Sequence, residues 1–146
     1  MEYKKLKKFY KNKKVLVTGN TGFKGIWLFL ILKFLGAKVK GYSLPLIKKD
    51  NFIFFKILKK HLNKDTVYGN ILDNRKLSKT VRFFKPQIIF HFAAQSLVIE
   101  SQKKPQETLE INLLGTNNIL DISLKTKSVK SLVIATSDKC YLNTGK

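Results

Sequence analysis

Short apolar runs alternate with segments of helical periodicity along most of this chain. The apolar runs predict strands at residues 14–17, 37–42, 65–70, 88–92 and 131–136. The periodic segments between them predict helices at residues 22–35, 52–62, 74–84 and 105–125. Strands that alternate with helices pair in parallel through right-handed crossovers. The pattern therefore predicts an α/β fold built on a parallel sheet.

The order of these elements is typical of a doubly wound sheet with strand order 3-2-1-4-5, which is a Rossmann-like arrangement. Gly36 ends the first helix, Asp73 caps the third, and Pro86 separates that helix from the fourth strand. Residues 1–13 form a basic lead-in to which the pattern assigns no element. We therefore expect one domain over residues 14–146.

Composition places the chain among globular proteins. Its 146 residues are 44% hydrophobic, and no apolar run reaches the 18 residues typical of a membrane span. The N-terminus is basic but leads into no signal-peptide core. The lone cysteine, Cys140, fits a reducing compartment. We therefore expect a cytoplasmic protein without a membrane partner and without a metal site.

The net charge of +20 invites a nucleic-acid-binding interpretation. The lysines are spread along the chain, and Arg75 and Arg82 are its only arginines. Because sequence-specific nucleic-acid surfaces rely on arginine, a solvated lysine-rich surface is the favoured interpretation. No nucleic-acid partner is expected, although the charge favours substrates that carry phosphates.

A glycine-punctuated turn joins the first strand to the first helix. Gly19, Gly22 and Gly25 follow the strand with the spacing G-x-x-G-x-x-G, one residue longer in its first step than the dinucleotide fingerprint. Glycine lets the backbone turn tightly and approach phosphates, which the helix N-terminus attracts. The turn predicts a dinucleotide site, and the alternative is a β–α turn without a ligand.

Polar residues gather at the other predicted strand ends. Asn70 follows the third strand, His91 to Ser96 lie at and after the fourth, and Thr136 to Lys139 follow the fifth. Ligands of doubly wound sheets bind at the carboxyl ends of the strands. The distribution of polar residues therefore favours a ligand at that edge.

Four segments together resemble the extended short-chain dehydrogenase/reductase family of nucleotide-sugar enzymes. They are T-G-x-x-G-F-x-G at 18–25, H-x-A-A at 91–94, N-x-x-G-T at 112–116 and A-T-S-D-K-C-Y at 135–141. Within that family, the segments 22–27, 93–95 and 136–141, the last of which contains Asp138-Lys139, look most like the CDP-glucose 4,6-dehydratase subfamily. The resemblance implies a lyase that holds NAD, acts on a nucleotide sugar such as CDP-glucose, and forms a homo-oligomer at full length.

The resemblance also implies a reaction and its residues. Hydride leaves carbon 4 of the sugar for bound NAD, water is eliminated across carbons 5 and 6, and hydride returns to carbon 6. Ser137 lies beside the 4-hydroxyl, Asp138 protonates the departing water, and Lys139 assists proton transfer. The alternative for these three residues is a polar loop after a strand. The residues implied to bind the cofactor are Gly19, Asn20, Thr21, Gly22, Phe23, Lys24, Gly25, Ser43, Asn70, Ile71, Phe92, Ala93, Ala94, Gln95, Asn112 and Thr136.

Two residues keep open alternatives. His91 is either a hydrogen-bonded core residue or a neighbour of the nicotinamide. Asn112 is either a packing residue of its helix or a structural contact near the active site.

The sequence departs from the family pattern in two places near the cofactor. The second strand ends without the acid that holds the adenosine ribose, so Ser43 takes part of that role, while Lys48 and Lys49 leave NADP open. Asn70 stands where the family has an aspartate, and it keeps an acceptor oxygen for adenine.

The family's catalytic Tyr-x-x-x-Lys does not follow Ser137 in this sequence. Tyr3 and Tyr10 have the right spacing to a lysine but precede the first strand. We therefore expect the N-terminal portion of a longer enzyme, truncated before the last strands and the substrate domain and inactive alone. The competing hypotheses are a nucleotide-sugar epimerase or reductase, and a non-catalytic nucleotide-binding module.

Overall fold

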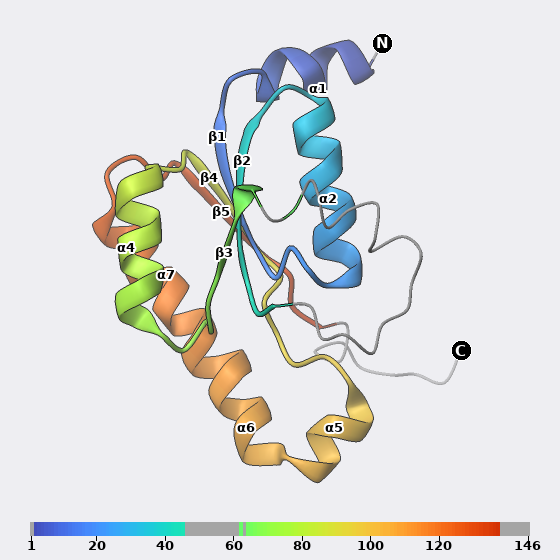
Figure 1. Cartoon of the computed structure of the whole chain (residues 1–146), viewed down its shortest axis with the longest axis vertical. Coiled ribbons are helices and arrows are strands. Elements are labelled where there is room, and N and C mark those ends of the chain that lie inside the picture. The colour runs from blue at the N-terminus through green and yellow to red at the C-terminus, as the bar shows by residue number, and fades with distance from the viewer. Residues whose placement is uncertain (1, 46–61, 63, 138–146) are drawn as a thin grey trace.

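The structure is a computed structural model, and it describes residues 2–45, 62 and 64–137 (Figure 1). The described part contains one parallel sheet of five strands in the order β3-β2-β1-β4-β5. The strands are β1 (Lys14–Thr18), β2 (Lys38–Ser43), β3 (Thr66–Tyr68), β4 (Ile88–His91) and β5 (Ser131–Ile134). The doubly wound fold and its strand order are confirmed, with strand ends that differ from the predicted ones by no more than two residues.

Helices cover both faces of the sheet. They are α1 (Glu2–Tyr10), α2 (Phe23–Phe34), α4 (Asn74–Phe84), α5 (Val98–Lys103), α6 (Pro105–Leu109), the π-helical turn η1 (Glu110–Leu114) and α7 (Gly115–Lys125). The third predicted helix matches α4 at both ends, and its N-cap is confirmed because the Asp73 side chain accepts a hydrogen bond from the Lys76 amide. The helix predicted at 52–62 lies outside the described residues except for Leu62.

Three helical features differ from the prediction. The basic lead-in contains α1, which buries none of its residues and contacts α2 through Tyr3 and Phe34. The segment after β4 contains α5, a short helix that also buries no residue. The helix predicted at 105–125 is interrupted by η1. Neither α1 nor α5 has the buried stripe that makes a helix recognisable from periodicity.

The two faces of the sheet have separate cores, as expected of parallel strands that are buried on both sides. The α2 face holds Val15, Val17, Ile26, Phe29 and Leu32. The α4 and α7 face holds a second cluster, whose members from the strands, α4 and α7 are Leu16, Tyr42, Leu77, Val81, Ile89, Ile119 and Ile122. Figure 1 shows α2 on one side of the sheet and α4 with α7 on the other.

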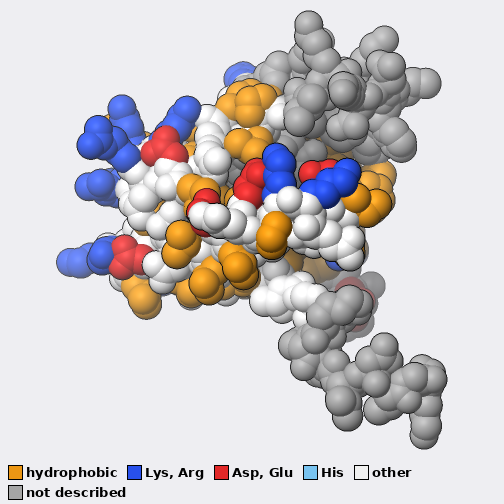
Figure 2. Space-filling model, turned by 90° about the horizontal axis from the view of Figure 1, so that it is seen from below, with side chains coloured by type: hydrophobic (Ala, Val, Ile, Leu, Met, Phe, Trp, Pro, Cys, Tyr) orange, Lys and Arg blue, Asp and Glu red, His pale blue; other side chains and the backbone are white. Residues whose placement is uncertain are grey.

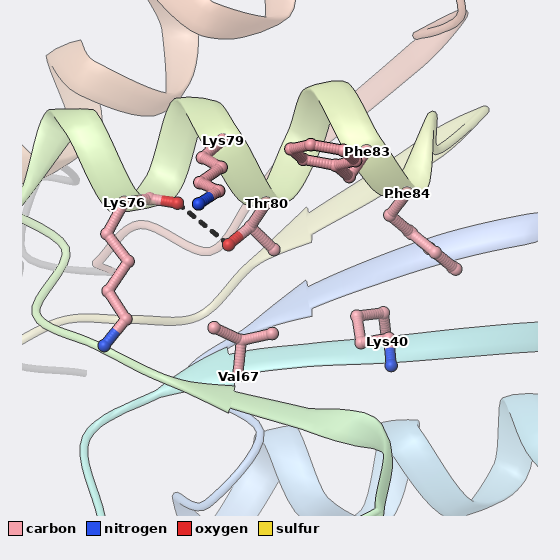
Figure 3. A pocket seen from close by; sticks show the side chains of 7 residues that line it. All are labelled: Lys40, Val67, Lys76, Lys79, Thr80, Phe83 and Phe84. Carbon is pink, nitrogen blue, oxygen red and sulfur yellow. Dashed lines mark hydrogen bonds between the residues drawn. The ribbon is translucent and has the colours of Figure 1, made fainter.

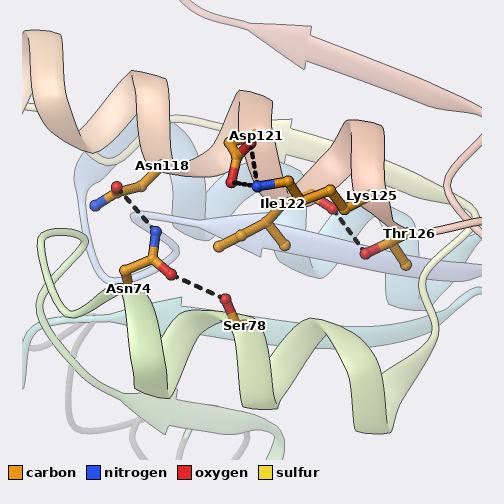
Figure 4. Close-up of polar contacts among 7 residues, drawn as sticks. All are labelled: Asn74, Ser78, Asn118, Asp121, Ile122, Lys125 and Thr126. Carbon is orange, nitrogen blue, oxygen red and sulfur yellow. Dashed lines mark hydrogen bonds and ion pairs between the residues drawn. The ribbon is translucent and has the colours of Figure 1, made fainter.

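Helices α4 and α7 are joined by side-chain hydrogen bonds (Figure 4). Asn74 donates through Nδ2 to Oδ1 of Asn118 at 3.1 Å, and the hydroxyl of Ser78 donates to Oδ1 of Asn74 at 3.1 Å. Asn118 also donates to the carbonyl of Ile71, at 3.1 Å. These bonds fix the segment after β3 against α7, which helps to position the carboxyl edge of the sheet.

The registers bring the carboxyl ends of three strands to one level. Thr18 of β1 pairs with Tyr42 of β2 and with His91 of β4. Residues that follow these three positions therefore meet at one edge of the sheet, where a doubly wound fold binds its ligands.

Candidate functional site

A cavity of about 470 Å³ lies at this carboxyl edge. It is formed by the segments that follow β1, β2, β3 and β4, with a contribution from α6 and η1. Its size is within the range of ligand sites, which are mostly apolar with a few placed polar groups. It is lined by Gly19, Thr21, Gly22, Tyr42, Ser43, Leu44, Gly69, Asn70, Ile71, Phe92, Ala93, Ala94, Gln95, Ser96, Leu97, Glu107 and Ile111.

The glycine turn forms one wall of the cavity. Gly19 has a φ of 70°, and a Cβ there would lie 2.7 Å from the amide nitrogen of Ala93. A Cβ on Gly25 would overlap the carbonyl oxygen of Gly19. These two glycines are thus required by the turn itself and by its contact with the segment after β4.

Gly22 has a different role. A Cβ there would meet only the Gly19 carbonyl oxygen, at 3.3 Å, which is a close contact but far looser than the overlap at Gly25. Gly22 is the N-cap of α2, and no side chain of the described residues caps this terminus. The first-turn N–H groups of α2 are therefore available to an anion in the cavity.

Hydroxyl groups meet where β2 ends. The hydroxyl of Thr21 donates to the carbonyl of Leu44 at 3.2 Å. It also lies 2.5 Å from the hydroxyl of Ser43, which is therefore the donor in that pair. Oxygens from the glycine turn and from β2 are thus held together at the cavity wall.

The segment after β3 is fixed by Tyr42. Its hydroxyl donates to the Asn70 carbonyl at 2.9 Å, and a Cβ on Gly69 would overlap that hydroxyl. Burial, and secondarily the charge of Asp73, raise the pKa of Tyr42 to about 12, so the phenol stays neutral. Asn70 accepts the Leu72 amide through Oδ1 at 3.0 Å and presents the rest of its side chain to the cavity.

Asn20 lies beneath the turn rather than in the cavity. It is fully buried, and its Nδ2 donates to the hydroxyl of Thr66 at 2.8 Å. A Cβ on Gly41 would overlap its amide group. Its Oδ1 is buried without a partner in the described structure. Asn20 therefore ties the turn to β2 and β3.

His91 links both halves of the sheet from behind the cavity. Its Nδ1 lies 2.7 Å from the hydroxyl of Thr18 on β1, and its Nε2 lies 3.3 Å from the hydroxyl of Thr116 on α7. The side chain is 2% exposed, and burial lowers the pKa of His91 to about 4, so the ring is neutral at pH 7. Of the two open alternatives, the hydrogen-bonded core residue is favoured, because His91 does not line the cavity.

Asn112 holds the loop after β4 from the π-helical turn. Its Oδ1 accepts the Gln95 amide at 2.8 Å, and its Nδ2 donates to the Gln95 carbonyl at 2.9 Å. The Gln95 side chain in turn accepts the Leu97 amide at 2.8 Å and donates to the Leu97 carbonyl at 3.0 Å. Asn112 thus makes structural contacts with the loop after β4, and its predicted contact with the cofactor stays a prediction.

The cavity brings together most of the predicted cofactor residues. Those that line it are Gly19, Thr21, Gly22, Ser43, Asn70, Ile71, Phe92, Ala93, Ala94 and Gln95. The others lie outside its lining. Asn20 and Gly25 are buried beneath it, Phe23 and Lys24 are exposed on the first turn of α2, Asn112 is exposed on η1, and Thr136 is exposed after β5.

The predicted catalytic residues are described only in part. Ser137 is exposed, three residues after the end of β5. Asp138 and Lys139 lie outside the described residues, as do Lys48 and Lys49.

Sequence reasoning missed several lining residues. Tyr42 was assigned to a strand, and its phenol reaches the cavity only because Gly69 leaves room for it. Glu107 and Ile111 come from helical segments, and Glu107 forms an exposed ion pair with Lys104 at 3.1 Å. The spacing of Glu107 and Ile111, four residues apart on a helix, is a signal for a shared face but not for a cavity.

The chain matches known proteins over nearly its whole length. A family model described as GDP-mannose 4,6 dehydratase matches residues 16–145. A CDP-glucose 4,6-dehydratase of Salmonella typhimurium is 42% identical over 137 residues, which are 94% of this chain and 38% of that protein. The chain thus spans well under half the length of this relative.

Solved structures have the same fold. The epimerase Mth375 of Methanothermobacter thermautotrophicus is 24% identical, with a TM-score of 0.81 over 99% of this chain and 41% of that one. A UDP-glucose 4-epimerase of Brucella ovis, solved in complex with NAD, is 27% identical, with a TM-score of 0.74 over 88% of this chain and 37% of that one. Within the described residues, no helix has the length and apolar character needed to cross a membrane.

Proposed function

The chain belongs to the GDP-mannose 4,6-dehydratase family, and we propose that it is the NAD-binding part of a nucleotide-sugar 4,6-dehydratase that acts on CDP-glucose. The observation that carries this proposal is the cavity at the carboxyl edge, into which the uncapped N-terminus of α2 opens. It combines an anion-binding helix end with hydroxyl and amide groups from three further strand ends.

Each part of a dinucleotide has its own set of residues in the proposed binding mode. The α2 N-terminus beside Gly22 suits the pyrophosphate, since a larger side chain there would occupy the space the phosphates need. Thr21 and Ser43 supply oxygens for the adenosine ribose, and Asn70 with Ile71 contact adenine. Phe92 to Ala94 line the nicotinamide side.

The lining favours NAD over NADP. A 2′-phosphate needs a nearby cation, commonly an arginine. None of the described lining residues is basic, and the acidic one among them, Glu107, is paired with Lys104. The hydroxyl pair at the end of β2 can bind a ribose but offers no charge to a second phosphate.

Bound NAD supplies a hydride acceptor that is regenerated within each cycle. The chain's own contribution to the chemistry comes from the segment after β5. Ser137 hydrogen-bonds the 4-hydroxyl of the sugar, Asp138 gives a proton to the departing 6-hydroxyl, and Lys139 assists proton transfer at carbon 5. The support is the position of Ser137 after β5, on the carboxyl side of the sheet.

We propose that turnover requires catalytic residues that the given sequence does not contain. The sequence contains no Tyr-x-x-x-Lys after Ser137, and the dehydratase relative has most of its length without a counterpart here. We propose that residues 1–146 bind NAD weakly and complete no reaction alone. The reducing cytoplasm is the compartment we propose, from the lone cysteine.

Calorimetric titration of the chain with NAD+ and NADP+ tests the cofactor proposal. We expect saturable binding of NAD+, weaker binding of NADP+, and a loss of roughly tenfold or more in NAD+ affinity for Gly22→Val. Gly36→Asn is the matched control, because Gly36 has a φ of 83°, which asparagine tolerates, and lies at the end of α2 away from the cavity. Equal affinity of the Gly22→Val variant and the wild type would overturn the assignment.

A nucleotide-sugar epimerase is the second candidate, favoured by the likeness to the NAD-bound UDP-glucose 4-epimerase of Brucella ovis. The two reactions differ in mass balance, since a 4,6-dehydratase removes water and an epimerase does not. Mass spectrometry of CDP-glucose and UDP-glucose, incubated with a C-terminally extended chain and NAD+, distinguishes them. Loss of water from CDP-glucose is expected, and an isomer without mass change points to the epimerase.

A further inference from the structure

A second cavity, of about 580 Å³, lies between α4 and the β2–β3 edge of the sheet. Its lining shares no residue with the cavity at the carboxyl edge. Figure 3 shows α4 above it and β2 with β3 below. It is lined by Lys40, Val67, Lys76, Lys79, Thr80, Phe83 and Phe84.

The cavity combines an apolar interior with a cationic rim. Val67 of β3 and Phe84 of α4 are half-buried, and Phe83 is 77% exposed beside them. The amines come from Lys40 on β2 and from Lys76 and Lys79 on α4. The Thr80 hydroxyl donates to the Lys76 carbonyl at 2.8 Å, which leaves the amines as the groups able to bind an anion.

The three amines have no carboxylate to neutralise them within the described residues. The ion pairs found there involve Lys33, Lys104 and Lys125, none of which lies on α4, β2 or β3. Lys79 instead lies over the ring of Phe83, with its Nζ 6.0 Å from the ring centroid. The Phe83 ring and the Lys79 amine therefore lie together at the rim of the cavity.

Packing of α4 onto the sheet does not account for these side chains. The buried stripe of α4 consists of Leu77 and Val81, four residues apart. Lys76, Thr80 and Phe83 form a second stripe at helical spacing, which overhangs β3 instead of entering the core. A half-exposed apolar stripe beside an open sheet edge is a surface that a ligand can cover.

We propose that this second cavity binds a small aromatic molecule that carries a phosphate group. The ring packs against the half-buried Val67 and Phe84, and the phosphate binds to lysine amines at the rim. Lysine binds phosphate as a point charge, and three amines suit a dianion. The inference does not depend on the identity of the cofactor or of the sugar.

The test uses phenyl phosphate as the probe with the ¹⁵N-labelled chain. We expect amide shifts confined to α4, β2 and β3, and an affinity roughly tenfold higher than for inorganic phosphate or for phenol alone. The double variant Lys40→Gln, Lys79→Gln is expected to lose roughly tenfold in affinity. Arg82→Gln is the matched control, because it removes one charge from the exposed side of the same helix.

Saturating NAD+ separates this cavity from the one at the carboxyl edge. Phenyl phosphate shifts on α4 are expected to be unchanged by NAD+. Shifts that instead map to Gly19–Gly22, equal affinity for inorganic phosphate and phenyl phosphate, or unchanged affinity in the double variant would each overturn the proposal.

Discussion

Strands β1 and β5 have similar apolar sequences but different surroundings. In β1, Val15, Leu16 and Val17 are fully buried, between strands on both sides and helices on both faces. In β5, Val133 is 45% exposed, and among the described residues the strand has one neighbour, β4. Burial of a strand is thus decided by the elements around it, because each additional neighbour and covering helix removes surface from water.

The same contrast in packing distinguishes the cofactor side of the sheet from the side toward β5. The cofactor side rests on β1 and β2, where the turn and strands are packed closely enough that side chains on Gly25 or Gly41 would overlap their neighbours. The side toward β5 has Phe90 and Val133 facing a cavity of about 370 Å³ beneath α1. Exposed leucines occur on the outer surface of α6, η1 and α7, namely Leu109, Leu113, Leu120 and Leu124.

Apolar exposure continues onto the adjoining end of the molecule. Leu97, Val98 and Ile99, at the start of α5, are each about two-thirds exposed. Figure 2 looks onto this end and shows hydrophobic side chains between scattered charged groups. Exposed apolar side chains thus gather on the β5 side and at the α5 end of the described structure, in contrast to the close packing around β1 and β2.

The largest loss of stability is expected for a substitution in the closely packed glycine turn. Gly25→Val is expected to lower the free energy of unfolding by about 3 kcal/mol, because its side chain would overlap the Gly19 carbonyl oxygen. Urea denaturation followed by circular dichroism measures it. Gly22→Ala is the control and should stay within about 1 kcal/mol of the wild type. Equal losses in both variants would contradict the distinction between the two glycines.

A matched pair of truncations measures the contrast between the strands directly. Val17→Ala leaves a cavity in the core and should cost about 2.5 kcal/mol, whereas Val133→Ala should cost less than about 0.5 kcal/mol. The readout is again urea denaturation. Similar losses at both positions would mean that β5 is covered in solution, for instance by a second copy of the chain.

Acidification tests how much His91, which contacts Thr18 of β1 and Thr116 of α7, contributes to stability. Its folded pKa, about 4, lies below the unfolded value of 6.5, so the unfolded chain binds more protons in this range. Stability present above pH 6.5 is therefore lost as the pH falls toward 4, by about 2 kcal/mol between pH 7 and pH 5. Denaturation series at both pH values measure it, and His91→Gln should flatten the difference. An unchanged pH slope in that variant would remove His91 as the cause.

Much of the fold was predictable because its signals are local. Apolar strands, Gly36 at the end of α2 and Asp73 at the start of α4 each act within a few residues. The α1 and α5 helices were missed because exposed helices have no buried stripe to reveal them. The position of β5 at the edge of the sheet followed from the predicted strand order, whereas the exposure of single residues such as Val133 depends on the elements that cover them.

The candidate site was predictable where one segment forms it and not where distant segments meet. The glycine turn and the segment 92–95 were identified from their own residues. Tyr42 and Glu107 reach the cavity through tertiary contacts that no local pattern encodes. His91 and Asn112 have polar side chains whose partners, Thr18 and Gln95, lie far away in the sequence.

The π-helical turn at Glu110–Leu114 restricts the insertions and deletions that this segment tolerates. It contains one residue more than the corresponding stretch of an α-helix. The extra residue shifts the helical phase of the residues before the turn relative to those after it. Deleting Leu113 or Leu114 would restore a continuous helix and rotate Asn112 by about 100° relative to α7. Asn112 would then face away from Gln95, while Ile119 and Ile122 stayed in the core. The spacing between residues 112 and 119 is therefore constrained more tightly than the identity of the residues between them.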